Sequence, residues 1–218
     1  MNVYFTGFFL IFSALLYSQQ FKRIKAKQGK DEDYFRYQDY AAPDKPIGEP
    51  IFLKGCSWYC GGSVQVISAS SELSENKGIT YSAANAHDFD KNTAWIEGKP
   101  GYGVGEFIEY HFDFRDLQDY KGGLGITKIL LANGYKKNKQ VWENNSRIQQ
   151  LKMYVNGEPY AVLNLIDSFE MQTIDIGTIK FPSNKETILK FEITKVYEGK
   201  RYKDTAISLL MFDGIGVH

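Results

Sequence analysis

The sequence has few cysteines, no net charge and no long basic stretch, and each of these absences narrows what the protein can do. Its 218 residues carry 26 basic and 26 acidic side chains, so the chain lacks the positive field that binding to a phosphate backbone requires. A small basic cluster at Lys136, Lys137 and Lys139 is typical of a solvated loop, because an asparagine interrupts it and a glutamate follows it. We therefore do not expect nucleic acid as a partner.

Cysteine and histidine are too sparse to predict a zinc site. Three residues separate Cys56 from Cys60, and the two thiols can form a disulfide once the chain has left the reducing cytoplasm. Zinc would need two further ligands. Because His87, His111 and His218 lie far apart in the sequence, we expect them to be satisfied core or surface histidines.

Only the N-terminus carries a long apolar run. Val3 to Tyr17 is uncharged and almost wholly apolar, and Ser18 provides a small residue for cleavage, so residues 1–18 are predicted to be a signal peptide. The run is too short to cross a bilayer comfortably, and we expect an exported, periplasmic or secreted protein with no transmembrane span in the mature chain. An uncleaved anchor is the alternative, since a basic region precedes the run in most signal peptides and here follows it, from Lys22.

The remainder divides into an arm and one domain. Residues 19–52 are rich in Lys, Asp, Gln and Tyr and contain Pro43, Pro46 and Pro50, which indicates an extended N-terminal arm or linker. Residues 53–218 are long enough to form a single domain with an ordinary core.

Short alternating segments predict an all-β domain. Ile108 to Phe114 is apolar at even positions and polar at odd ones, as in a strand with one buried face. Leu151 to Val155 alternates likewise and reaches Asn156-Gly157, a pair that can supply the positive φ angles of a tight hairpin. Further strands are predicted at 64–69, 126–131, 161–165, 172–176, 189–195 and 207–212. About eight strands without a competing helical period favour an antiparallel, closed or double-sheet architecture.

Residues 85–106 hold the densest group of chemically interesting side chains. Asp88, Asp90 and Thr93 lie within six positions and can turn oxygen ligands toward one calcium ion, although the same residue types also cap turns by bonding their own backbone. Glu97 and Glu106 have the chemistry of a glycosidase carboxylate pair, but nothing in the sequence fixes their separation.

The glycines at 101, 103 and 105 are not a dinucleotide fingerprint, which needs wider spacing between a strand and a helix. We expect these glycines to let a loop pass close to another backbone, with Tyr102 exposed at its tip.

The pattern from Asn85 to Trp95 resembles the discoidin, or coagulation-factor type C, superfamily. Taken together, further motifs make residues 53–218 similar to the glycan-binding domain of the NAD-glycohydrolase translocation type. These motifs are Cys56-Ser-Trp-Tyr-Cys-Gly-Gly62, Ala69-Ser-Ser, Thr93-Ala-Trp-Ile-Glu-Gly98, Gly101-Tyr-Gly-Val-Gly-Glu106, Asn133-Gly-Tyr135, Asn145-Ser-Arg147, Val196-Tyr-Glu-Gly199 and Tyr202-Lys-Asp-Thr205. The resemblance implies a galactose-binding-like jelly-roll β-sandwich and a binding module without NAD-cleaving activity.

Two positions depart from the family pattern. Phe89 replaces the glycine that usually follows the first aspartate, and Leu209-Leu210 stand where the family often has Ser-Glu-apolar. That glutamate often helps to hold calcium in the superfamily, so its absence leaves the ion with fewer ligands.

Sugar recognition needs an aromatic face and nearby polar groups for the hydroxyls. The loops supply both kinds of residue, and most of the aromatic side chains, which include Trp58 and Tyr59, are expected to be structural; Trp95 is expected in the core. Arg147 and Asp204 are as consistent with an ion pair between loops as with ligand contacts. The candidate ligand-binding residues are Glu97, Tyr102, Glu106, Asn133, Tyr135, Trp142, Asn145, Arg147, Tyr197, Tyr202 and Asp204.

The sequence thus predicts an exported, non-catalytic module that binds a glycan or glycoconjugate. The alternatives are a module that docks an envelope protein and, third, a hydrolase of glycosides or NAD. Apart from calcium, no cofactor is expected.

Overall fold

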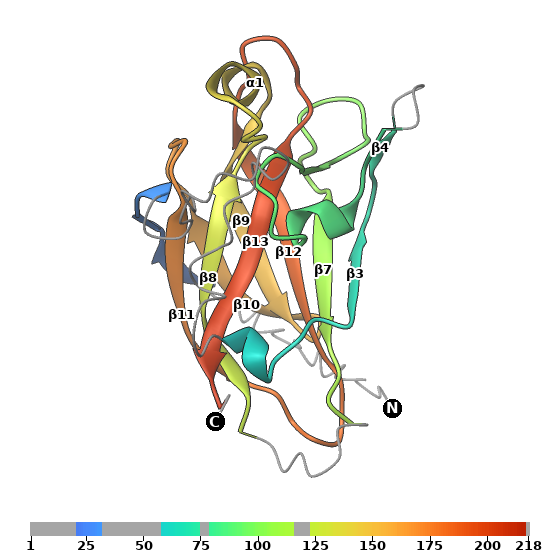
Figure 1. Ribbon diagram of the computed structural model, residues 1–218, viewed down its shortest axis with the longest axis vertical. Coiled ribbons are helices and arrows are strands. Elements are labelled where there is room, and N and C mark those ends of the chain that lie inside the picture. The colour runs from blue at the N-terminus through green and yellow to red at the C-terminus, as the bar shows by residue number, and fades with distance from the viewer. Residues whose placement is uncertain (1–20, 32–57, 75–78, 116–122, 217–218) are drawn as a thin grey trace, which may run out of the picture.

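The computed structural model describes residues 21–31, 58–74, 79–115 and 123–216. Over these residues, two β-sheets lie face to face, and a short helix and several loops gather at one end (Figure 1). The sheets have the strand orders β1-β10-β9-β12-β7-β3 and β2-β11-β8-β13-β6, and β4-β5 forms a separate hairpin. Every pair is antiparallel except β1 with β10. The predicted antiparallel β-sandwich is confirmed.

The elements have the following bounds. The six-stranded sheet contains β1 (Lys22–Lys25), β3 (Val66–Ala69), β7 (Phe107–Phe112), β9 (Arg147–Val155), β10 (Glu158–Asn164) and β12 (Thr187–Tyr197). The five-stranded sheet contains β2 (Lys27–Gln28), β6 (Trp95–Ile96), β8 (Gly125–Asn133), β11 (Gln172–Lys180) and β13 (Ala206–Ile215). The hairpin and helices are β4 (Leu73–Ser74), β5 (Thr80–Tyr81), the 3-10 helices η3 (Trp58–Cys60) and η4 (Ala83–Ala86), and α1 (Lys139–Asn144).

Each of the eight predicted strands corresponds to a strand of the sandwich. In β7, the side chains at even positions are buried and those at odd positions are half-buried, as the alternation predicts. Asn156 and Gly157 join β9 to β10 with φ angles of 52° and 81°, which confirms the predicted tight turn.

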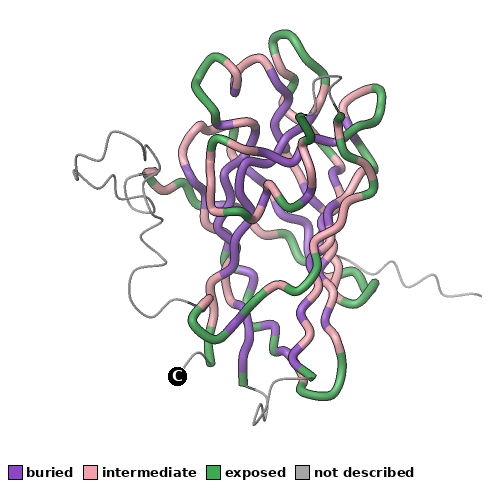
Figure 2. The backbone as a smooth tube through the Cα atoms, turned by 45° about the vertical axis from the view of Figure 1, so that its right-hand side comes forward, coloured by how far each residue is buried: buried purple, intermediate pink, exposed green. Residues whose placement is uncertain are grey.

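The core lies between the two sheets and is rich in aromatic rings. Trp58 packs edge-on against Phe112, Phe181 and Phe212, with ring centroids 6.0, 6.1 and 6.4 Å apart. Figure 2 shows the buried residues concentrated along the strands and the exposed ones along the loops. Because Trp58 and Trp95 are 1% and 0% exposed, both are core residues, as predicted for Trp95.

The N-terminal segment described here, residues 21–31, is paired with both sheets. β1 lies parallel to β10 at the edge of one sheet, and β2 pairs with β11 at the edge of the other. Ala26, between these two strands, is buried. Residues 21–31 of the arm expected from the sequence therefore have an extended conformation, and they belong to the folded sandwich. A polar sequence can join a sheet edge in this way because the pairing uses backbone N–H and C=O groups.

A buried ion pair fixes the end of this segment. Lys136 Nζ lies 2.6 Å from Asp31 Oδ1, and the lysine side chain is completely buried. The same carboxylate accepts a hydrogen bond from the backbone N–H of Met171, and Lys91 Nζ approaches its other oxygen at 3.5 Å. Burial lowers the pKa of Lys136, and Asp31 opposes that effect. The prediction of a solvated basic loop is wrong for Lys136, because the aspartate that compensates its charge is distant in sequence.

His87 is a satisfied histidine, as predicted, and is half-buried against the core. Its Nδ1 lies 2.8 Å from the carbonyl oxygen of Leu210, and its ring contacts Tyr59, Tyr110 and Phe212. Burial lowers its pKa to about 4. His111 pairs with Glu186 on the surface at 2.7 Å, and His218 lies outside the described residues.

The depressed pKa of His87 predicts that stability falls between pH 7 and pH 5. The His87 imidazole binds a proton near pH 6.5 in the unfolded chain, but only near pH 4 in the folded chain. The contribution of neutral His87 is therefore complete above pH 6.5 and is lost as the pH falls toward 4, by about 2 kcal/mol between pH 7 and pH 5. Urea unfolding at these two pH values should show this loss in the wild type and a clearly smaller one in His87→Phe. An equal loss in both proteins would refute the assignment.

Cys60 ends η3 and is exposed, and Cys56 lies outside the described residues, so the disulfide stays a prediction. The predicted signal peptide also lies outside the described part. Among the residues that are described, no helix has the length and apolar character needed to cross a membrane.

Candidate functional site

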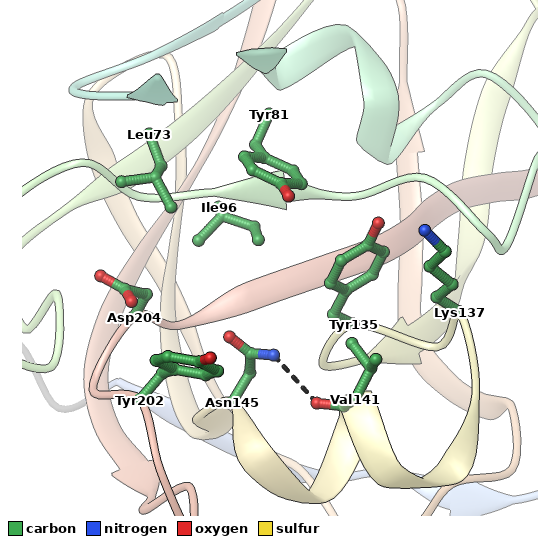
Figure 3. A pocket seen from close by; sticks show the side chains of 9 residues that line it. All are labelled: Leu73, Tyr81, Ile96, Tyr135, Lys137, Val141, Asn145, Tyr202 and Asp204. Atoms are coloured by element: carbon green, nitrogen blue, oxygen red, sulfur yellow. Dashed lines mark hydrogen bonds between the residues drawn. The ribbon is translucent and has the colours of Figure 1, made fainter. Parts of the chain in front are cut away.

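An open pocket of about 320 Å³ lies at the end of the sandwich that carries α1. The hairpin β4-β5, strand β6, helix α1 and the loop before β13 supply its walls (Figure 3). Its apolar base is continuous with a small cluster of Ala94, Ile96 and Ala206, against which Tyr81 and Tyr135 pack. The lining residues are Leu73, Tyr81, Ile96, Tyr135, Lys137, Val141, Asn145, Tyr202 and Asp204.

Three of the predicted ligand-binding residues anchor helix α1 to the sandwich, and one of them, Trp142, is the buried residue of the helix itself. The Asn133 side chain donates to the Ile148 carbonyl at 2.7 Å and accepts from the Ile148 N–H at 2.9 Å. Trp142 Nε1 donates to the Asn133 carbonyl at 2.8 Å, and the Arg147 guanidinium lies over the Trp142 ring at 4.7 Å. Asn133, Trp142 and Arg147 thus position the helix and do not line the pocket.

Arg147 is paired with Asp167, which rules out the Arg147–Asp204 ion pair that the sequence left as an alternative to ligand contacts. Arg147 donates to both carboxylate oxygens of Asp167 at 3.0 and 2.9 Å. Its remaining nitrogen donates to the carbonyls of Asn145 and Glu198. The sequence could not reveal this pair, because Asp167 lies in a loop with no motif of its own.

Backbone hydrogen bonds hold the loop that carries Tyr202 and Asp204 against α1. The N–H of Tyr202 donates to the carbonyl of Asn144 at the end of the helix, and the carbonyl of Asp204 accepts from the N–H of Ser146. Ser146 Oγ also donates to the Tyr202 carbonyl at 3.3 Å. Tyr202 and Asp204 contribute only backbone atoms to these bonds, so both side chains remain available to the pocket. Tyr202 is 42% exposed and Asp204 is half-buried.

Asn145 is oriented by the end of the helix. Its backbone N–H and its side-chain Nδ2 both donate to the Val141 carbonyl, the latter at 2.9 Å. Because the amide nitrogen is committed to that carbonyl, the oxygen is the atom presented toward the pocket (Figure 3). Across the pocket, Tyr81 and Tyr135 meet edge-on with centroids 5.8 Å apart.

The structure therefore brings four predicted ligand-binding residues together, Tyr135, Asn145, Tyr202 and Asp204. It adds five that sequence reasoning missed: Leu73, Tyr81, Ile96, Lys137 and Val141. β4 and β5 are two residues each, too short for a periodic signal. Lys137 belongs to the basic cluster assigned to a solvated loop, and it is exposed at the pocket rim.

Glu97 and Glu106 do not form a catalytic pair around this pocket. Glu97 is fully buried and accepts from the N–H groups of Lys99 at 2.8 Å and Thr205 at 3.3 Å. Burial raises the pKa of Glu97. Glu106 accepts from the hydroxyls of Ser70 and Ser71, whose effect outweighs burial and lowers its pKa. Each carboxylate thus stabilises a loop.

The other two predicted ligand-binding residues lie outside the pocket lining. Tyr102 sits between positive-φ glycines at 101 and 103, and its hydroxyl donates to Glu198 at 2.8 Å. The expected exposed tip and close backbone approach are wrong, because Tyr102 is half-buried and a Cβ at Gly101 or Gly105 would meet nothing within 4 Å. Tyr197 donates to the carbonyl of Leu165 at 3.0 Å.

The three residues predicted to bind calcium lie together in the loop of residues 85–93, which we call the Asp88 loop. Thr93 Oγ1 lies 2.7 Å from Asp88 Oδ2, 2.8 Å from the Asp90 carbonyl oxygen and 3.4 Å from that of Asn85. These are hard oxygen donors of the kind calcium takes, and they are four of the usual six to eight. No described lysine or arginine pairs with Asp88, and burial raises its pKa.

Turn capping occupies part of the same donor set. The N–H of Asp90 donates to Asp88 Oδ1 at 2.9 Å, and the N–H of Asn92 donates to Asp90 Oδ1 at 2.8 Å. Within the described residues, no group of three or more His, Cys, Asp or Glu side chains has a metal-binding arrangement. A cation here would therefore depend on the threonine hydroxyl and backbone carbonyls.

Comparison with known families identifies this architecture. The sequence profile of the NAD glycohydrolase translocation F5/8 type C domain matches residues 58–213. The chain belongs to this family. The resemblance seen in the sequence is confirmed, and the F5/8 type C domain is a type of binding module. A search of curated protein sequences gives no significant match.

Solved structures place the F5/8 type C domain in the galactose-binding-like fold. The structure of the CBM32-1 and CBM32-2 domains of Clostridium perfringens ZmpB in complex with GalNAc is similar to this chain, with a TM-score of 0.52 and 12% sequence identity. The match covers 90% of this chain and 40% of that one. The same domains without that ligand give a TM-score of 0.51 at 12% identity, covering 92% of this chain and 43% of that one. The chain thus spans less than half the length of these relatives, and such low identity establishes the fold alone. The predicted galactose-binding-like jelly roll is confirmed.

Proposed function

We propose that this F5/8 type C domain is a non-catalytic module that binds a glycan in the pocket beside α1. The observation that carries the proposal is the lining, in which three tyrosine rings and an apolar base stand beside an amide oxygen, a carboxylate and an ammonium group. Rings pack against the C–H face of a sugar, and the polar groups bond its hydroxyls. The pocket volume of about 320 Å³ is near the lower limit for small-molecule sites, which favours one or two sugar rings over a long chain.

The relatives support the same conclusion, since one of them is a carbohydrate-binding domain solved with GalNAc. Neither glutamate considered for hydrolysis lines the pocket. A binding role therefore accounts for the arrangement of these side chains without a catalytic step.

A glycan array followed by titration calorimetry on the strongest ligand tests the proposal. The wild type should bind, and Tyr202→Ala should bind about tenfold more weakly because it loses a stacking face worth roughly 1.4 kcal/mol. Tyr154→Ala is the matched control, since Tyr154 lies on β9 and its hydroxyl bonds Glu192. Absence of binding across the array, or equal losses in both variants, would contradict the proposal.

The main rival is an envelope protein partner that docks on the same exposed aromatics. Pull-down from an envelope extract in the presence and absence of the calorimetric ligand separates the two. A protein that is retained, and that the sugar does not displace, would favour the rival.

We further propose that one calcium ion stabilises the Asp88 loop. If the dissociation constant of the ion is submillimolar, about 5 mM free calcium should raise the Tm by about 3 °C or more above the Tm measured in EDTA. Asp88→Asn should lose this increase, whereas Asp113→Asn, which alters a carboxylate paired with Arg115, should retain it. An unchanged Tm in the wild type would show that turn capping alone closes the loop.

We also propose that the chain is exported through its apolar N-terminal segment. The support is the run from Val3 to Tyr17 and the small residue that follows. Cell fractionation with N-terminal sequencing should find a chain starting close after Ser18 in the periplasm or medium. An intact N-terminus in the membrane fraction would instead indicate a retained anchor.

A further inference from the structure

One side of the pocket carries an uncompensated negative charge. The Asp204 carboxylate lines the pocket and is half-buried, and no described lysine or arginine forms an ion pair with it. Of the neighbouring basic side chains, Arg201 lies over the Tyr202 ring at 5.1 Å and Lys203 over the Tyr102 ring at 5.5 Å, and neither forms an ion pair with Asp204. A ligand group that contacts Asp204 therefore contacts a carboxylate that no described basic side chain neutralises through an ion pair.

A second acidic side chain lies near this side of the pocket. Glu97 is fully buried behind the loop and accepts from the N–H of Thr205, the residue next to Asp204. Burial raises the pKa of Glu97, and the nearby Asp204 adds to that rise, so the two acidic groups interact. Lys137 lies across the pocket in Figure 3, is exposed and does not neutralise either group by contact.

The atoms next to Asp204 are acceptors as well. Asn145 presents its oxygen, because its Nδ2 donates to the Val141 carbonyl, and the Tyr202 ring borders the same side of the pocket (Figure 3). A carboxylate, an amide oxygen and an aromatic face match an ammonium group, which has three donors and no acceptor and is attracted to aromatic rings. An acetamido group would lose the charge and place a carbonyl oxygen among acceptors.

From this arrangement we propose that the pocket selects a sugar with a free, protonated amine, and that Asp204 determines the selectivity. The inference rests on the proposed glycan-binding function and names the class of sugar that the site takes. Asp204 holds the ammonium group, Asn145 accepts a second hydrogen bond from it, and Tyr202 stacks beside it.

Calorimetric titrations with matched methyl glycosides test the inference at pH 6, where the amines are protonated. The probes are the glycosides of glucosamine and galactosamine, their N-acetyl forms, and those of glucose and galactose. The wild type should bind the amine forms about tenfold more tightly than the other two forms, as expected for a charge-assisted hydrogen bond. Asp204→Asn should abolish this preference and leave the affinity for the neutral sugars nearly unchanged.

The controls separate failure of this inference from failure of the proposed function. Asp175→Asn alters a carboxylate that pairs with Lys27 on the surface and should keep the preference. Asp204→Asn should unfold at the wild-type temperature, since none of the hydrogen bonds that hold its loop uses the Asp204 side chain. Equal or tighter binding of the acetylated or neutral forms by the wild type would overturn the inference alone. Absence of binding by all six glycosides would overturn it, and absence of binding across the glycan array would overturn the proposed function with it.

Discussion

Asp31→Ala is expected to lower the free energy of unfolding by about 3 to 5 kcal/mol, because it leaves the buried ammonium group of Lys136 without its counter-charge. The lysine side chain is wholly inaccessible, and Asp31 approaches it at 2.6 Å. The substitution also removes the acceptor for the N–H of Met171. Urea denaturation at pH 7 measures the loss.

A double-mutant cycle identifies the cause. Asp31→Ala with Lys136→Met removes both charges, and we expect it to recover at least half of the loss, since an apolar side chain tolerates burial. Asp175→Ala is the control, because Lys27 and Asp175 also approach to 2.6 Å, but both are well exposed. It should change stability little. A small effect of Asp31→Ala, similar to that of the control, would contradict the claim that residues 21–31 are part of the folded domain.

Gly134→Ala is expected to destabilise the protein by about 2 to 4 kcal/mol, from backbone strain and overpacking together. Gly134 has a φ of 81°, a conformation that is costly for any residue with a Cβ. A methyl group there would lie 2.5 Å from Arg147 Cγ and 2.8 Å from the Trp142 ring. Because Trp142 anchors α1 from within the helix and Arg147 packs on its ring, the pocket should also lose ligand affinity.

Gly157→Ala separates strain from overpacking. Its φ is also 81°, but a Cβ at Gly157 would have nothing within 4 Å. We expect Gly157→Ala to lower the free energy of unfolding by about 1 kcal/mol and to leave ligand affinity unchanged. Equal stability and equal ligand affinity of the two variants would contradict the claim that α1 packs closely only because Gly134 lacks a Cβ.

The strands were predictable because their signals are local. Ile108 to Phe114 shows its buried face through simple alternation, and Asn156-Gly157 can form its turn from its own backbone preferences. The family motifs extended that prediction to the jelly-roll topology, which alternation alone does not specify.

The site was only partly predictable because its chemistry depends on long-range partners. Tyr202 and Asp204 were identified from their residue types in a loop, and the structure places them in the pocket. Arg147 was a candidate for the same reason, but Asp167, 20 residues away in sequence, occupies it. Tyr81 was missed because the hairpin that carries it has strands of two residues each.

The N-terminal segment shows a similar limit. Its composition is polar, which is typical of a linker, yet β1 and β2 join the sheets through backbone hydrogen bonds and one buried alanine. The carboxylate that makes this pairing specific, Asp31, acts on Lys136, more than a hundred residues later.

The most direct test of glycan binding in the pocket beside α1 is a ¹H–¹⁵N correlation titration with the tightest ligand from the glycan array. We expect the largest shifts from the amides that surround the pocket, those of Lys137, Val141, Asn145, Tyr202 and Asp204. Shifts centred instead on the groove formed by Asn156, Lys185 and Thr187, or no shifts at saturating ligand, would contradict glycan binding in this pocket.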